Sequence, residues 1–130
     1  MSIHAQSSGL LTALRDHRYM RLTTYRRTGA PVTTPVWFVM NDHAVFLYTL
    51  ASAGKLKRIR NNPKVTVAPA DSRGNPLGAE YDGLAQILPE TEGRMIDQLM
   101  GRKYGLQLTA LKLMYRLQKV KRVFIQIETA

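Results

Sequence analysis

The sequence contains no cysteine, which excludes disulfide frameworks, thiolate metal sites and cysteine nucleophiles. Its three histidines, His4, His17 and His43, are far apart and form no helix-spaced pair with one another or with a carboxylate, so we expect no metal site. No apolar run approaches the roughly 18 residues that a membrane-spanning helix needs. Residues 1–9 lack the basic and then apolar pattern of a secretory signal, so we expect a cytoplasmic protein.

Acidic residues are scarce. Nine Asp and Glu stand against 19 Lys and Arg, and the formal net charge of +10 favours an anionic partner such as nucleic acid, an acidic membrane surface or a phosphorylated cofactor. No acidic residue occurs between Asp97 and Glu128. The basic residues of that interval are Arg102, Lys103, Lys112, Arg116, Lys119, Lys121 and Arg122. We expect this stretch to face water or an anion.

The 130 residues are enough for one domain with its own hydrophobic core, and we expect residues 1–130 to form a single domain. Runs rich in β-forming residues and bounded by turn residues predict six strands, at residues 19–25, 32–40, 44–50, 65–68, 81–88 and 123–127. Helical spacing of apolar residues predicts helices through Arg15 and at residues 52–61, 90–104 and 108–117. The early strands lack the long crossovers that parallel pairing needs. The sequence therefore predicts a mainly β protein, a small six-stranded antiparallel barrel with peripheral helices.

The most informative stretch runs from Thr49 to Arg60 and joins a strand end, a loop of small residues and a helix start. Lys55, Lys57 and Arg58 crowd that helix start, although the amino end of a helix already carries partial positive charge. A bound anion, such as a phosphate, would resolve the conflict. The alternatives are a solvated basic helix face and a nucleic-acid patch. The chain shows no helix-turn-helix, zinc-knuckle or RNP-like motif, so nucleic-acid binding would be nonspecific and salt-sensitive.

A second informative stretch is the strand around Pro35. Alternation places three residues on each face, Thr34, Val36 and Phe38 on one and Thr33, Pro35 and Trp37 on the other. Because proline donates no ladder hydrogen bond, Pro35 indicates an edge or gap of the sheet, where a flat ring could approach the backbone. The alternative is a core strand with an edge proline, and for Trp37 alone core packing is the better interpretation.

Together these stretches resemble the pyridoxamine-phosphate-oxidase-like split β-barrels, which include the deazaflavin-dependent oxidoreductases of actinobacteria. The resemblance covers residues 19–88. Its best-matched positions are Tyr48-Thr49, Lys55, Asn62-Pro63 and residues 65–67, and the spacing from Lys55 to Pro63 matches the phosphate-binding lysine and following Asn-Pro of that superfamily. Residues 33–38, 55–60 and 71–74 look more like the deazaflavin branch than the pyridoxamine branch.

The resemblance implies a split barrel of the FMN-binding type and a homodimer with the cofactor in a groove between subunits. The cofactor-binding residues that it implies are Thr33, Thr34, Pro35, Val36, Trp37, Tyr48, Thr49, Ser52, Lys55, Arg58 and Arg60. The phosphate would lie near Lys55 and the ring against residues 34–37. FMN-dependent oxidases usually carry arginines where Gly54 and Thr34 stand here, whereas the polyglutamate tail of coenzyme F420 suits a basic chain.

We therefore expect an F420-dependent oxidoreductase that transfers a hydride between the deazaflavin and a small organic substrate, with FMN as the alternative cofactor. The cofactor carries the chemistry in such proteins, and the sequence shows no acid–base pair that compels a catalytic assignment. The other interpretations are an FMN-binding oxidase, a non-catalytic carrier of flavin, deazaflavin or haem, and, more remotely, a basic nucleic-acid-binding protein.

Overall fold

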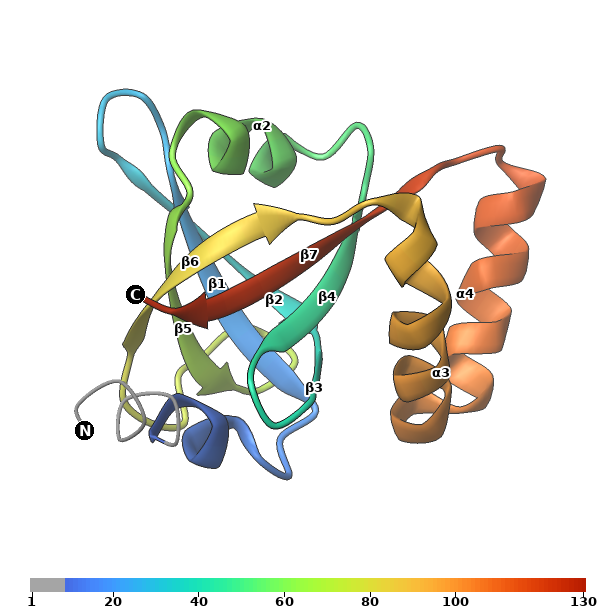
Figure 1. The fold of residues 1–130 in the computed structure, drawn as a ribbon, viewed down its shortest axis with the longest axis horizontal. Helices are drawn as coiled ribbons and strands as arrows, with labels where there is room; N and C mark the ends of the chain where they lie inside the picture. The colour runs from blue at the N-terminus through green and yellow to red at the C-terminus, as the bar shows by residue number, and fades with distance from the viewer. Residues whose placement is uncertain (1–8) are drawn as a thin grey trace.

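The computed structural model of the protein describes residues 9–130 (Figure 1). The strands are β1 (Tyr19–Tyr25), β2 (Pro31–Trp37), β3 (Val39–Met40), β4 (Val45–Leu50), β5 (Lys64–Ala70), β6 (Tyr81–Ile87) and β7 (Arg122–Thr129). The helices are α2 (Gly54–Asn61), α3 (Gly93–Tyr104) and α4 (Leu106–Leu117), with a short 3-10 turn, η1 (Glu90–Glu92), before α3. Residues 9–14 are also helical. No helix within residues 9–130 is long and apolar enough to cross a membrane.

All seven strands belong to one curled sheet in the order β2-β1-β5-β6-β7-β4-β3, and every neighbouring pair is antiparallel. Strands β2 and β3 are consecutive in the chain yet lie at opposite edges of the sheet. Since one residue, Phe38, separates the two strands, the sheet must curl until its two edges meet. At this meeting β2 lies against β4 without a ladder joining them. This open seam makes the molecule a split barrel, as the sequence predicts.

The number of strands differs from the six predicted, because residues 32–40 divide at Phe38 into β2 and β3. The Phe38 amide donates to the hydroxyl of Tyr104 at 3.0 Å instead of to a neighbouring strand. The Phe38 carbonyl accepts from Lys103 Nζ at 2.9 Å. Side chains of α3 thus satisfy both backbone groups at the bend, so the chain can leave one ladder and enter another.

Two apolar clusters hold the fold together. One fills the barrel and contains Leu22, Leu47, Val67, Ile125 and Ile127, with the residue 9–14 helix covering one end. The other lies between the outer side of the sheet and α3. Alternation along β4 supplies both clusters, because Val45 and Leu47 face the barrel while Phe46 and Tyr48 face α3 and α4.

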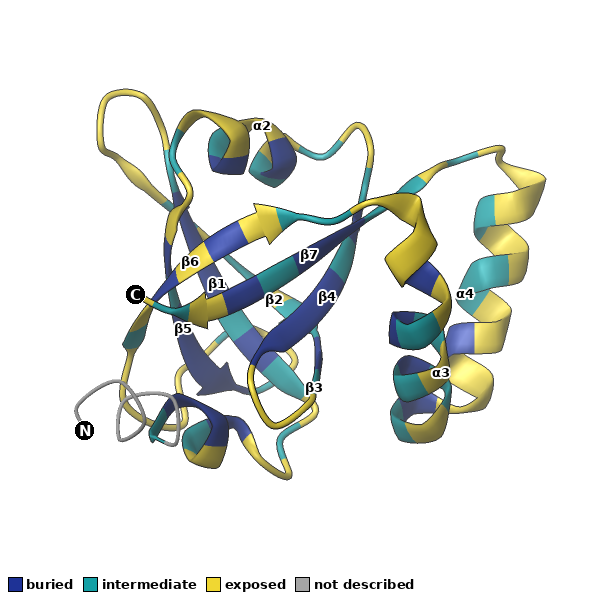
Figure 2. Ribbon diagram, in the orientation of Figure 1, coloured by how far each residue is buried: buried dark blue, intermediate teal, exposed yellow. Residues whose placement is uncertain are grey.

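The predicted helices are found with adjusted limits: α2 begins at Gly54, α4 begins at Leu106, and η1 precedes α3 in the predicted 90–104 segment. In Figure 1, α2 covers the top of the barrel, whereas α3 and α4 form a separate layer on its right. Most residues of α4 and of the loops are exposed, whereas α2 alternates between exposed and buried residues (Figure 2).

Candidate functional site

The start of α2 is positively charged by its backbone and by its side chains. Strand β4 ends at Leu50, and the amide of Ala53 closes a turn on the Leu50 carbonyl at 2.9 Å before the helix begins. Ala53, at the N-cap, offers no side-chain acceptor, and the first turn contains no acidic residue. The free N–H groups at this end therefore lack the usual side-chain caps and leave a partial positive charge. Lys55 and Lys57 place two further positive charges at the same end of the helix.

Lys55 is half-buried at this helix start. Burial lowers the pKa of its ammonium group, and the nearby guanidinium of Arg58 lowers it further. Within residues 9–130 both ion pairs involve Asp97 on α3, so no carboxylate of the described chain neutralises Lys55 and Arg58. Two adjacent, partly desolvated cations of this kind are stabilised by a bound anion.

Arg58 is held in place by β1. Its Nε donates to Thr24 Oγ1 at 2.7 Å, and Thr24 is buried in the sheet. A Cβ at Gly54 would lie 2.9 Å from Arg58 Nη1, so the absence of a side chain at Gly54 leaves room for the guanidinium. Leu56 and Ile59 anchor the opposite face of α2 in the core. The helix therefore presents a fixed guanidinium at its exposed amino end.

A cavity of about 510 Å³ opens between α2 and the β1–β2 turn, and we call it the basic cleft. It is lined by Arg26, Arg27, Gly54, Lys57, Arg58 and Asn61. Arg27 and Asn61 join its two walls through a long hydrogen bond of 3.5 Å. Four of the six lining residues are cationic and none is acidic, so the cleft is built for an anionic group. Lys55 is not part of this lining, but it lies on the same helix and its charge interacts with that of Arg58.

Sequence reasoning missed Arg26 and Arg27 as site residues. The consecutive arginines at a hairpin turn were the available signal. Their relevance depends on packing between the hairpin and α2, which local sequence does not reveal: the hydrogen bonds that join the two elements link residues 34 positions apart.

The predicted ring-binding strand is β2, which lies at an edge of the sheet as Pro35 indicated. Thr33 and Pro35 are exposed, whereas Thr34 and Val36 are half-buried. The Thr33 hydroxyl shares a hydrogen bond of 2.7 Å with Thr23 on β1. Trp37 stacks on Tyr104 with centroids 4.2 Å apart and planes inclined by 8°. The available outer surface of this strand is therefore Thr33 and Pro35, while Trp37 is engaged in packing.

The remaining predicted residues are dispersed. Tyr48 faces α4, with its ring edge-on to Tyr115 at 6.1 Å and the Arg122 guanidinium 4.9 Å from its centroid, and burial raises its pKa. Thr49 is buried, Ser52 is exposed just before α2, and Arg60 is exposed in the last turn of α2. The structure thus brings Lys55 and Arg58 together and directs the Tyr48 side chain towards the helical layer.

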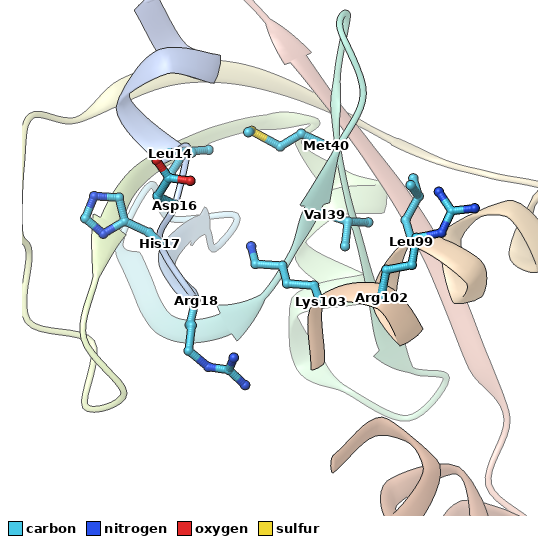
Figure 3. A pocket seen from close by; sticks show the side chains of 9 residues that line it. All are labelled: Leu14, Asp16, His17, Arg18, Val39, Met40, Leu99, Arg102 and Lys103. Atoms are coloured by element: carbon cyan, nitrogen blue, oxygen red, sulfur yellow. The ribbon is translucent and has the colours of Figure 1, made fainter. Parts of the chain in front are cut away.

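A second cavity, of about 440 Å³, lies near the Phe38 bend (Figure 3). Lys103 points into it, while the guanidinium groups of Arg18 and Arg102 point elsewhere. Lys103 Nζ lies 3.4 Å from the centroid of the Phe38 ring, and burial, assisted by the charge of Arg18, lowers its pKa to about 8. Since the same ammonium holds the Phe38 carbonyl, its evident role is to fix the bend.

The curled sheet with its open seam defines a split barrel. The family model for pyridoxamine 5'-phosphate oxidase matches residues 9–129, nearly the whole chain. The protein belongs to this family. No curated protein sequence matches it.

Solved structures share the fold at low sequence identity. An F420 reductase is 22% identical with a TM-score of 0.64, over 92% of this chain and 92% of that chain. The haem storage protein HutZ from Vibrio cholerae is 16% identical with a TM-score of 0.68, over 96% and 90%. An FAD-binding protein from Mesorhizobium loti is 18% identical with a TM-score of 0.63, over 93% and 85%. One fold therefore serves proteins named for three different ligands.

Proposed function

We propose that this protein is an F420-dependent oxidoreductase of the deazaflavin branch of its family, and that it transfers a hydride between the deazaflavin and a small organic substrate. The basic cleft at α2, the helix that also carries Lys55, is the observation that carries the proposal. Its cationic lining and the uncapped start of α2 suit a phosphorylated, polyanionic cofactor. The F420 reductase with the same fold supports the choice.

The distribution of cations favours F420 over FMN. Lys55, Arg58 and the amino end of α2 are sufficient for one phosphate. Arg26, Arg27 and Lys57 extend the positive surface across the cleft to the β1–β2 turn. FMN has no further negative group for these residues to bind, whereas the polyglutamate tail of F420 provides several carboxylates.

In this proposal each part of the site holds a different part of the cofactor. Lys55 and Arg58 bind the phosphate, with Thr24 fixing the guanidinium. Ser52 borders the amino end of α2, and Arg60 adds a cation in its last turn. Thr33 and Pro35 offer an edge-strand surface for the ring. The bound deazaflavin supplies the hydride chemistry, while the protein orients the ring and substrate. A partner subunit completes the groove in a homodimer, as in the family that the sequence resembles.

The test is a fluorescence titration of the protein with F420 and, separately, with FMN at moderate salt. We expect F420 to bind more tightly than FMN. Lys55→Ala should weaken F420 binding by about 10- to 100-fold, because a charged hydrogen-bond partner contributes about 1.5–3 kcal/mol. Arg102→Ala is the control, since Arg102 is an exposed cation in the last turn of α3, outside α2 and the basic cleft. Equal affinity of the wild-type and Lys55→Ala proteins would remove Lys55 from the site.

Turnover distinguishes an enzyme from a carrier. Reduced F420 is incubated with the protein and a panel of small organic acceptors, and cofactor oxidation is followed by absorbance. Oxidation that depends on both protein and acceptor supports the enzyme. Tight F420 binding without such oxidation indicates a carrier, and preference for FMN or haem assigns the cleft to that ligand.

A further inference from the structure

Helix α4 carries an exposed apolar stripe. Within residues 9–130, six large apolar side chains are exposed, and four of them, Leu106, Leu113, Met114 and Leu117, lie on this one helix. Leu106 is 85% exposed and Leu117 is 76% exposed. Separations of seven and four residues place Leu106, Leu113 and Leu117 along one line of the helix, with Met114 beside it. These four residues are the apolar stripe.

The stripe points away from the core of the protein. Leu108 is the one fully buried residue of α4, and the inward Tyr115 packs against Tyr48. Helix α3 lies between α4 and the sheet, and the outer surface of α4 is exposed along much of its length (Figures 1 and 2). The described chain has no element that covers the stripe. A contiguous apolar surface on the outermost helix is typical of an interaction site.

Cations border the stripe. Arg116 lies on α4 itself, and the exposed Lys119 and Lys121 follow directly after it. A hollow of about 280 Å³ beside the stripe is lined by Thr109, Lys112, Leu113 and Arg116. Within residues 9–130 only Lys112 and Arg122 form ion pairs, both with Asp97. Arg116, Lys119 and Lys121 form none there, so they can bind an external anion.

We propose that α4 docks the protein on an anionic lipid surface. The leucines and Met114 would enter the boundary between headgroups and acyl chains, while Arg116 and the two following lysines pair with lipid phosphates. An acidic peptide would satisfy the cations but would give the leucines no apolar layer. A second copy docked stripe to stripe would bring the same cations together, which like-charge repulsion opposes. A lipid surface matches both features, and the proposal does not depend on the cofactor.

The experiment is co-sedimentation of the full chain with phosphatidylcholine vesicles and with vesicles containing about one quarter phosphatidylglycerol, at low and high salt. We expect binding to the anionic vesicles that weakens as salt rises, and little binding to phosphatidylcholine alone. Leu113→Glu/Leu117→Glu should reduce the partition coefficient by about tenfold or more, because it puts charge into the apolar contact. Leu77→Glu is the matched control, since Leu77 is 57% exposed on the loop between β5 and β6.

A charge variant keeps the test independent of how the leucine variant folds. Arg116→Gln/Lys119→Gln should weaken binding about fivefold for each charge removed, with an unchanged melting temperature. The proposal is overturned if the wild-type protein does not sediment with anionic vesicles, or if the leucine variant binds as the wild type does. A leucine variant of smaller mass in light scattering, with no vesicle binding by the wild type, would instead assign the stripe to a second copy. F420 affinity should stay the same in all these variants.

Discussion

At the scale of the single residue, Tyr104 connects three chain segments. Its hydroxyl accepts from the Phe38 amide and donates to the carbonyl of Arg18 at 2.6 Å, while its ring stacks on Trp37. Tyr104→Phe keeps the stack but leaves the Phe38 amide buried without its acceptor. We expect the free energy of unfolding to fall by about 1–3 kcal/mol, measured by urea denaturation. Tyr19→Phe is the control, since the Tyr19 hydroxyl makes no hydrogen bond within residues 9–130. An unchanged midpoint in Tyr104→Phe would contradict this role.

Lys103 predicts a pH dependence of stability. Its pKa is about 8 in the folded protein, chiefly because burial disfavours the charged form, against an ordinary value of 10.5. From about pH 8 to about pH 10.5 the unfolded chain therefore holds more of this proton than the folded chain, and the free energy of unfolding rises with pH. In Lys103→Met this contribution of Lys103 to the rise of the free energy of unfolding with pH should be absent. The measurement compares both proteins by urea denaturation across the window, and parallel curves would contradict the prediction.

At the scale of the element, one carboxylate joins the helical layer to the barrel. Asp97 on α3 forms two hydrogen bonds of 2.7 Å with Arg122 on β7 and lies 3.5 Å from Lys112 on α4. Burial alone would raise the pKa of Asp97, but Arg122 and Lys112 hold it below the usual range. The bidentate contact is partly buried, so it should contribute more than an exposed ion pair does.

Asp97→Asn should therefore lower the free energy of unfolding by about 1–3 kcal/mol near neutral pH. The carboxylate contributes its stability above its unfolded pKa and loses it as pH falls through the lower folded pKa, so the difference from wild type should shrink in acid. Urea denaturation of both proteins, near neutral pH and in acid, measures this difference. Asp42→Asn should be neutral, because Asp42 is exposed and forms no ion pair within residues 9–130. A loss that is equally large at acid pH would point to a packing effect.

The elements also show how far the sequence alone could lead. Local patterns sufficed for α2 and for the basic helix start at Lys55, because small residues, charges and the Asn62-Pro63 stop are adjacent in the chain. The division of strand 32–40 at Phe38 was not predictable, since the groups that permit it come from Tyr104, 66 positions away. The orientation of Tyr48 towards Tyr115 depends in the same way on a distant helix.

At the scale of the whole molecule, the net charge links assembly to ligand binding. Each chain carries a formal charge of +10, so two chains repel one another, most strongly at low salt. If the proposed dimer encloses an anionic cofactor in its groove, bound cofactor offsets part of that repulsion and binds the dimer in preference to the monomer. F420 should therefore lower the concentration at which the chain dimerises.

Sedimentation velocity over a range of protein concentrations, with and without F420, measures this shift. The shift should be larger at about 50 mM salt than at about 500 mM salt. Screening at the higher salt concentration weakens the repulsion between the two chains, and it therefore also weakens the effect of the anionic cofactor on that repulsion. Lys55→Ala should reduce the shift in proportion to its loss of F420 affinity, while Arg102→Ala should retain it. A monomer–dimer equilibrium that is indifferent to F420 at both salt concentrations would place the cofactor within one subunit, with the basic cleft alone holding it.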